Sequence, residues 1–163
     1  MSKLISGPIE PEKVSDVISK HSHKTDIGAF VTFCGQVRED IVGYKKVEAI
    51  QFSAYKEMAI REIDNIRERI LQDYPVKCMH IYHSIGEVKV GSICFFILIA
   101  APHRKQIYTA LDETVELFKA NVPIWKELIL EDGTNVWKED EEKYLLNETT
   151  ERKNNSYLKD KIK

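Results

Sequence analysis

The sequence has few of the features that mark a membrane-bound, secreted or nucleic-acid-binding protein. Its 24 basic and 26 acidic residues give a net charge of −2, so it lacks the basic excess that attracts nucleic acid. The longest apolar run, residues 93–102, is far shorter than the ~20 residues that span a bilayer. The first residues (MSKLISGP) lack the basic start and apolar stretch of a signal peptide. We expect a cytoplasmic protein that binds neither membrane nor nucleic acid.

Cysteine is scarce and widely spaced. The three cysteines, Cys34, Cys78 and Cys94, form no CxxC pair. An odd number of distant cysteines argues against a disulfide framework and against a structural zinc site. The sequence also lacks the motifs of phosphate-binding loops, dinucleotide-binding folds, serine hydrolases and zinc peptidases. We therefore predict no metal and no bound cofactor.

Glycine and proline are also few, at 7 and 5 of 163 residues, and no stretch of them forms a linker. Apolar residues make up 43% of the chain, which is enough for one hydrophobic core at this length. From Lys138 onward the composition changes to Glu, Lys and Asn. We expect one domain over residues 1–137 and a charged tail or helix over 138–163.

Helical and strand patterns alternate along the expected domain. Apolar residues spaced three and four apart predict helices over 11–20, 55–74 and 103–121. β-Branched and aromatic runs predict strands over 28–34, 47–54, 76–83, 93–101, 123–130 and 135–138, with a loop over 35–46 and turns over 86–91 and 131–133. The nearly continuous apolar run at 93–101 indicates a strand buried on both faces. Paired strands between single helices predict an α+β fold with a mainly antiparallel sheet.

Basic residues gather at the ends of the expected elements. Arg38 follows the first strand, His103 and Arg104 open the last helix, Lys119 lies in its final turn, and Lys126 comes soon after. Loop amides and helix ends bind anions, and arginine holds phosphate through two hydrogen bonds. Lysines held close together become usable nucleophiles or bases, because each charge disfavours protonation of the other. If the fold brings these residues together they form a phosphate-accepting pocket, although helix dipoles favour lysine at such positions without any function.

Other candidate sites have weaker signals. His21 and His23 lie in a polar loop, where paired histidines are usually solvated. His80 and His83 are three residues apart in an expected strand, so they point to opposite faces and do not share a metal. Cys34 ends a strand beside a glycine loop and could act as a nucleophile, but a buried strand cysteine is the simpler interpretation.

Five segments resemble the large, catalytic subunit of molybdopterin synthase, the MoaE family. They are 28–38 (GAFVTFCGQVR), 85–91 (IGEVKVG), 102–104 (PHR), 117–119 (LFK) and 122–127 (VPIWKE). Their order and spacing match from residue 28 to residue 137. The resemblance implies an α/β-hammerhead fold of the α+β class and a sulfurtransferase of molybdenum cofactor biosynthesis.

The resemblance also implies a reaction and partners. Members of this family convert cyclic pyranopterin monophosphate (precursor Z) into molybdopterin by adding two sulfurs as a dithiolene. A small ubiquitin-like subunit carries the sulfur as a thiocarboxylate on its C-terminal Gly-Gly. Two large subunits form a homodimer, and one small subunit docks at each end to give a heterotetramer. This sequence ends in KIK, so we expect the sulfur carrier to be a different chain.

By matching motifs, the resemblance assigns Lys119 and Lys126 as the catalytic lysines. It places Arg38, His103 and Arg104 in the substrate pocket, with the last two supplied by the neighbouring subunit. Four more residues fall in substrate-contacting stretches: Gln36, Val37, Glu127 and Leu128.

Two other functions stay open at this point. An anion- or nucleic-acid-binding module could use the same basic residues, and a structural paralogue could keep the dimer without the activity. The net charge of −2 argues against the first, and the presence of both lysines argues against the second.

Overall fold

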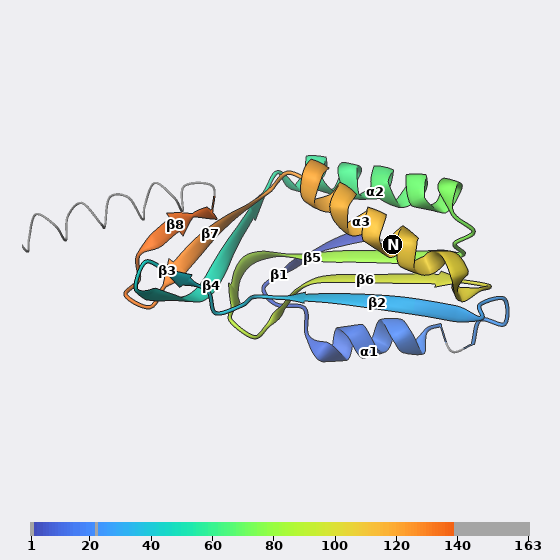
Figure 1. Ribbon diagram of the computed structural model, residues 1–163, viewed down its shortest axis with the longest axis horizontal. Helices are drawn as coiled ribbons and strands as arrows, with labels where there is room; N and C mark the ends of the chain where they lie inside the picture. The colour runs from blue at the N-terminus through green and yellow to red at the C-terminus, as the bar shows by residue number, and fades with distance from the viewer. Residues whose placement is uncertain (1, 22, 139–163) are drawn as a thin grey trace, which may run out of the picture.

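The computed structural model describes residues 2–21 and 23–138, so the expected tail from residue 139 onward lies outside the described residues. The described part forms an eight-stranded sheet with helices on both faces (Figure 1). The strand order is β2-β6-β5-β4-β7-β8, with β1 beside β5 and β3 beside β4. The β1–β5 pair is parallel and the other pairs are antiparallel. The predicted α+β class and mainly antiparallel sheet are confirmed.

The element bounds follow the sequence patterns closely. The strands are β1 Ser2–Ser6, β2 Ala29–Gln36, β3 Ile41–Val42, β4 Lys45–Ala54, β5 Cys78–Lys89, β6 Ile93–Ala101, β7 Ile124–Leu130 and β8 Asn135–Trp137. The helices are α1 Pro11–Ser19, α2 Lys56–Asp73 and α3 Ile107–Asn121, with a 3-10 turn η1 at Arg104–Gln106. Among the described helices, none is long and apolar enough to cross a membrane.

The structure departs from the sequence-based expectation in three places. The short strands β1 and β3 were not predicted, because five and two residues are too few to show a clear alternation. The expected turn over 86–91 is wrong for its first part, since β5 continues to Lys89. Gly86 has a φ of +86° and pairs with Phe52 of β4, so this glycine bends a strand instead of ending it.

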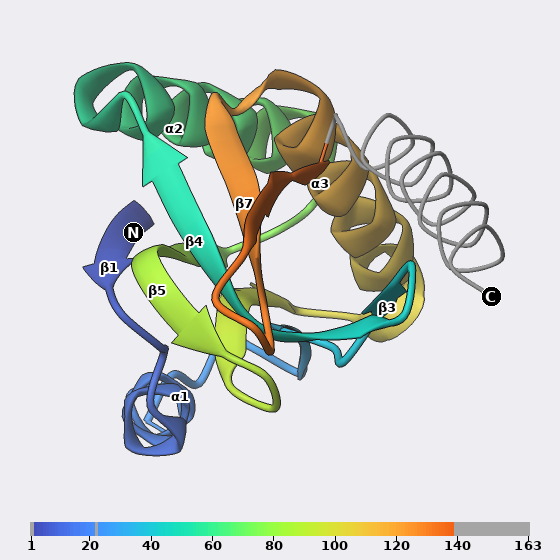
Figure 2. The ribbon, with the colours of Figure 1, turned by 90° about the vertical axis from the view of Figure 1, so that its left-hand side faces the viewer.

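β5 joins two halves of the sheet because it pairs with β6 over residues 78–83 and with β4 over residues 86–89. In the first half, α2 and α3 cover one face and α1 covers the other (Figures 1 and 2). Alternation along β5 places Met79 and Ile81 in the core beneath α2 and α3, and Tyr82 in the core beneath α1. Between β2 and β5, β6 is buried on both faces, as predicted.

The second half of the sheet, built on β4, β7 and β8 with β3 at its side, extends beyond the helices at one end (Figure 1). α3 ends at Asn121 and β7 begins at Ile124, with Pro123 between them. Proline disfavours helical geometry in the residue before it, so the chain turns sharply from helix to strand. This turn brings the last residues of α3 next to the first residues of β7, where the two halves of the sheet meet.

Candidate active site

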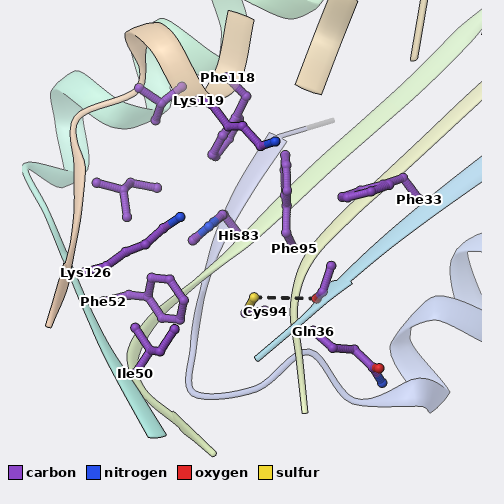
Figure 3. Close-up of a pocket in the computed structure, with 13 residues that line it drawn as sticks. Phe33, Gln36, Ile50, Phe52, His83, Cys94, Phe95, Phe118, Lys119 and Lys126 are labelled. Carbon is purple, nitrogen blue, oxygen red and sulfur yellow. Dashed lines mark hydrogen bonds between the residues drawn. The ribbon is translucent and has the colours of Figure 1, made fainter. Parts of the chain in front are cut away.

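A cavity of about 300 Å³ lies where the C-terminal end of α3 meets the junction of the two sheet halves (Figure 3). Residues from β2, β4, β5, β6, α3 and β7 line it. Its walls are largely aromatic, formed by Phe33, Phe52, Phe95 and Phe118. The rings of Phe95 and Phe118 pack with centroids 4.3 Å apart. Flat apolar walls of this kind accept a planar ring and keep water away from polar groups in the cavity.

Two lysines bring positive charge to this apolar cavity. Lys119 in the last turn of α3 and Lys126 on β7 both line it, and Figure 3 shows their side chains entering from these two elements. The Lys119 side chain is 61% exposed, and its ammonium lies 3.8 Å from the Glu116 carboxylate one turn earlier. A pair this long and exposed is weak. The Lys119 ammonium can therefore turn toward a ligand at little cost.

His83 on β5 forms the inner wall beside the lysines. Its ring stacks on Phe118 with centroids 5.2 Å apart and meets Phe52 edge-on at 5.1 Å. Its Nδ1 lies 2.7 Å from the Ser84 carbonyl oxygen, so Nδ1 carries the proton and donates it. Burial lowers the pKa of His83 to about 4; the bond to Ser84 opposes this shift and the charge of Lys126 adds to it. The imidazole is thus neutral at pH 7, with its Nε2 free to accept a hydrogen bond.

The cysteines contribute no thiolate to this site. The Cys94 thiol lines the cavity and lies 3.5 Å from the Gly35 carbonyl oxygen. Burial raises its pKa, and the charge of Lys126 opposes that rise only in part. The interpretation of Cys34 as a buried residue is wrong, because its side chain is exposed on β2. Burial of part of the Cys34 thiol raises its pKa as well, which is unfavourable for a nucleophile.

Arg38 lies beside the cavity in an adjoining hollow. This hollow is also about 300 Å³ and is lined by Arg38 and Leu128; it shares Gln36, Ile50 and Lys126 with the first cavity. The Arg38 side chain is 83% exposed, and its guanidinium donates two hydrogen bonds to the Asp40 carboxylate, at 2.5 and 3.2 Å. Arg38 and Lys126 therefore offer two cations to one ligand group, with the Asp40 carboxylate holding the guanidinium in place.

Two of the four residues from the substrate-contacting stretches, Val37 and Glu127, have side chains that line neither the cavity nor the adjoining hollow. Val37 is 2% exposed and packs with Phe52 in the core. Its amide donates to the Ser92 carbonyl and its own carbonyl accepts from the Gly91 amide, which fixes the backbone between Gln36 and Arg38. Glu127 sits between Lys126 and Leu128 on β7, so its side chain points to the opposite face of the sheet from theirs.

His103 and Arg104 lie at the other end of α3 from Lys119. Both are exposed, and Arg104 begins the 3-10 turn that precedes the helix. A helix rises ~1.5 Å per residue, so Arg104 and Lys119 are roughly 22 Å apart along the helix axis. One chain therefore does not bring these two residues to the lysines.

The sequence motifs identified the lysines but missed most of the cavity wall. His83, Cys94 and the four phenylalanines come from five different elements. The one available signal was strand alternation, which placed His83 on the opposite face from His80. The structure confirms this placement, since His83 packs on Phe118 of α3 while His80 packs on His21 near α1.

An α+β fold whose cavity combines aromatic walls, two lysines and a neighbouring arginine has the features of an enzyme's binding site for an anionic, ring-containing ligand. The family model described as "MoaE protein" matches residues 4–121. The chain belongs to this family, the catalytic subunits of molybdopterin synthase in molybdenum cofactor biosynthesis. The resemblance seen in the sequence motifs, and the enzyme class it implied, are confirmed.

Curated relatives and solved structures agree with this assignment. The chain is 37% identical over 106 residues to the molybdopterin synthase catalytic subunit of Pyrococcus abyssi, which covers 65% of this chain and 71% of the relative. It is 34% identical over 131 residues to that of Staphylococcus carnosus, covering 80% and 84%. The crystal structure of molybdopterin synthase from Staphylococcus aureus matches with a TM-score of 0.73 and 32% identity, over 83% of this chain and 95% of the other.

A more distant structure shares the fold. It is the complex of subunits 1 and 2 of molybdopterin-converting factor from Helicobacter pylori, with a TM-score of 0.72 and 22% identity. The match covers 84% of this chain and 89% of the other.

Proposed function

We propose that this chain transfers sulfur from a thiocarboxylated carrier protein to cyclic pyranopterin monophosphate, forming the dithiolene of molybdopterin. The observation that carries the proposal is the meeting of Lys119 and Lys126 in one aromatic-walled cavity. That cavity offers a flat apolar surface for a pterin ring and positive charge for its phosphate and for an acyl intermediate.

The two adjoining hollows divide substrate binding between them. The outer hollow is lined by Arg38, Lys126, Lys138 and Gln36 together with the Asp40 carboxylate. Its three cations and its amide suit a phosphate group. Leu128 forms its apolar base. The aromatic inner cavity then accepts the pterin ring. Val37 and Glu127 do not bind the substrate through their side chains. The backbone hydrogen bonds of Val37 fix the positions of Gln36 and Arg38, and Glu127 is part of the strand β7 that carries Lys126.

The lysines act on the sulfur transfer itself. In each transfer the carrier's sulfur forms a bond to a substrate carbon, and a carbon–oxygen bond at that carbon breaks, its oxygen leaving as water or with the phosphate. Water then attacks the carrier's carbonyl carbon, or the Lys119 amine attacks it first and water hydrolyses the resulting amide. In either case the bond between that carbon and the sulfur breaks, the sulfur stays on the substrate as a thiolate, and the carrier leaves as a carboxylate. Lys119 serves as nucleophile or proton carrier, and Lys126 stabilises the negative charge that develops on oxygen. Two such transfers produce the dithiolene.

The sulfur carrier is a small ubiquitin-like protein whose C-terminal Gly-Gly tail enters the cavity. The two-subunit complex of the Helicobacter pylori protein supports such a partner. We also propose a homodimer within a heterotetramer, in which His103 and Arg104 of one chain reach the pocket of the other. Their distance from Lys119 within one chain supports that arrangement. Three free cysteines are in keeping with a cytoplasmic location.

Reconstitution tests this function directly. The purified chain is mixed with a thiocarboxylated small subunit and precursor Z, and the product is followed by mass. We expect the dithiolene product, and none when the carrier has an ordinary carboxylate end. If the carrier binds but no product forms, the chain is an anion-binding scaffold and the proposal is wrong.

A further inference from the structure

His21, Cys78 and His80 form a cluster on the face of the sheet opposite the proposed active site. Cys78 and His80 are two residues apart on β5, so their side chains lie on the same face of the sheet, the face that α1 covers. His21 follows α1, which ends at Ser19. Cys78 Sγ lies 3.2 Å from His21 Nε2 and 3.4 Å from His80 Nε2. The three potential ligand atoms all lie within 4.8 Å of one another.

These separations suit a tetrahedral metal ion. Zinc binds cysteine sulfur at ~2.3 Å and histidine nitrogen at ~2.0–2.1 Å, so sulfur and nitrogen on one tetrahedral ion lie about 3.5 Å apart. The sulfur–nitrogen separations here differ from that value by only a few tenths of an ångström. The two imidazole nitrogens lie within 4.8 Å of one another and have to approach to about 3.3 Å on one ion, a change that side-chain rotation must supply.

The environment of His21 also fits a metal ligand. This side chain is 5% exposed, and its Nδ1 lies 2.7 Å from the Val17 carbonyl oxygen, to which it donates. That bond places the proton on Nδ1 and leaves the Nε2 lone pair directed at the Cys78 sulfur. In a metal-bound histidine, the ring nitrogen that does not bind the metal usually donates a hydrogen bond to a nearby oxygen, such as a backbone carbonyl, and this bond fixes the orientation of the ring. On the other side, His80 Nδ1 lies 3.4 Å from the Tyr82 hydroxyl.

We propose that His21, Cys78 and His80 bind one zinc ion, with a fourth position open to water. On binding, the Cys78 thiol releases its proton to solvent and the two imidazoles bind as neutral ligands. The ion ties the segment after α1 to β5 and so stabilises their packing. The sequence-based expectation of no metal considered the pairs His21 with His23 and His80 with His83, whereas the fold brings His21 against Cys78, 57 residues later in the sequence, and beside His80.

Cobalt titration of the metal-free full-length protein tests the site. We expect one equivalent of Co²⁺ to give a sulfur-to-metal charge-transfer band and the strong visible bands of four-coordinate cobalt, and zinc to displace it. Cys78→Ala should abolish the charge-transfer band. His80→Gln should weaken cobalt binding at least about 100-fold. Removing a residue that only hydrogen-bonds to a metal ligand costs up to about 100-fold in metal affinity, so a larger loss indicates that His80 is itself a ligand.

Two matched variants serve as controls. Cys34→Ser removes an exposed cysteine and His23→Gln removes an exposed histidine two residues from His21; both should bind cobalt like the wild type. Zinc should also raise the melting temperature of the wild type but not that of Cys78→Ala. The proposal is overturned if the wild type shows no stoichiometric band, or if the band survives in both Cys78→Ala and His80→Gln.

Discussion

At the residue scale, the candidate site is defined by charge placed among apolar and aromatic side chains. Lys119 and Lys126 come from different elements, and the neutral His83 lines the same cavity. Both lysine side chains are exposed, so their charges interact more strongly with an anionic group only once a ligand excludes water from the cavity.

Arg38 is expected to act in substrate binding. Arg38→Ala should raise KM about 10- to 100-fold, because hydrogen bonds to charged groups contribute about 1.5–3 kcal/mol. The value of kcat should change little, since the residue lies in the outer hollow. Steady-state kinetics with the thiocarboxylated carrier measures both constants. Arg61→Ala, an exposed arginine on α2, is the control. An unchanged KM in Arg38→Ala contradicts a role in holding phosphate.

His83 should make stability depend on pH in a defined range. Its pKa is about 4 in the folded protein against an ordinary value near 6.5. Between these values the unfolded chain binds more protons, so stability falls as pH is lowered from about 6.5 to 4 and then levels off. The full shift corresponds to about 3 kcal/mol. His80, with a pKa also lowered to about 4 mainly by burial, acts in the same direction.

Denaturant unfolding of the wild type and His83→Gln between pH 7 and pH 4 isolates this contribution. Gln does not titrate, and its amide can still donate to the Ser84 carbonyl. The variant should lose less stability than the wild type over the range, while the contribution of His80 stays common to both. Parallel pH profiles would show that His83 is not held neutral by burial.

At the element scale, local patterns predicted most of the fold. Apolar periodicity located the three helices, and Pro123 marked the turn from α3 into β7 that brings Lys119 and Lys126 together. The bend of β5 at Gly86 was not predicted, because a glycine in a strand and a glycine in a turn look alike in sequence. The cavity walls were also missed, since their residues meet only through tertiary packing.

The amphipathic helix α2 allows a test of this packing. Ile63 is fully buried against the sheet, while Ile60 on the same helix is 39% exposed. Ile63→Ala should destabilise the protein by about 2–5 kcal/mol, because it removes buried methyl groups and leaves a cavity. Ile60→Ala should cost less than about 1 kcal/mol. Chemical denaturation gives both values, and equal losses would contradict the observed orientation of α2.

At the scale of the whole molecule, the sheet has two halves joined by β5, with the cavity at the junction. The sequence motifs assign His103 and Arg104 to the same pocket as the two lysines. Within one chain, however, His103 and Arg104 lie before the start of α3 and Lys119 lies in its last turn, so the length of the helix separates them. If a second chain supplies these residues, each pocket needs two chains to be complete.

Mixed dimers test this shared pocket. Arg104→Ala and Lys119→Ala should each be inactive alone. After subunit exchange, half of the dimers combine both variants and hold one intact pocket of two, so activity should return to about a quarter of the wild-type value. If exchange is shown by mass but activity stays absent, the pocket is not shared between chains.

The most direct test of the central claim is a single-turnover assay of Lys119→Ala with thiocarboxylated carrier and precursor Z. Lys77→Ala, which changes an exposed lysine at the far end of β5 from the cavity, is the control. The account predicts that Lys119→Ala slows dithiolene formation at least about 100-fold, with carrier binding and melting temperature unchanged, while Lys77→Ala reacts like the wild type. A Lys119→Ala rate near that of the wild type would contradict the assignment of this cavity as the active site.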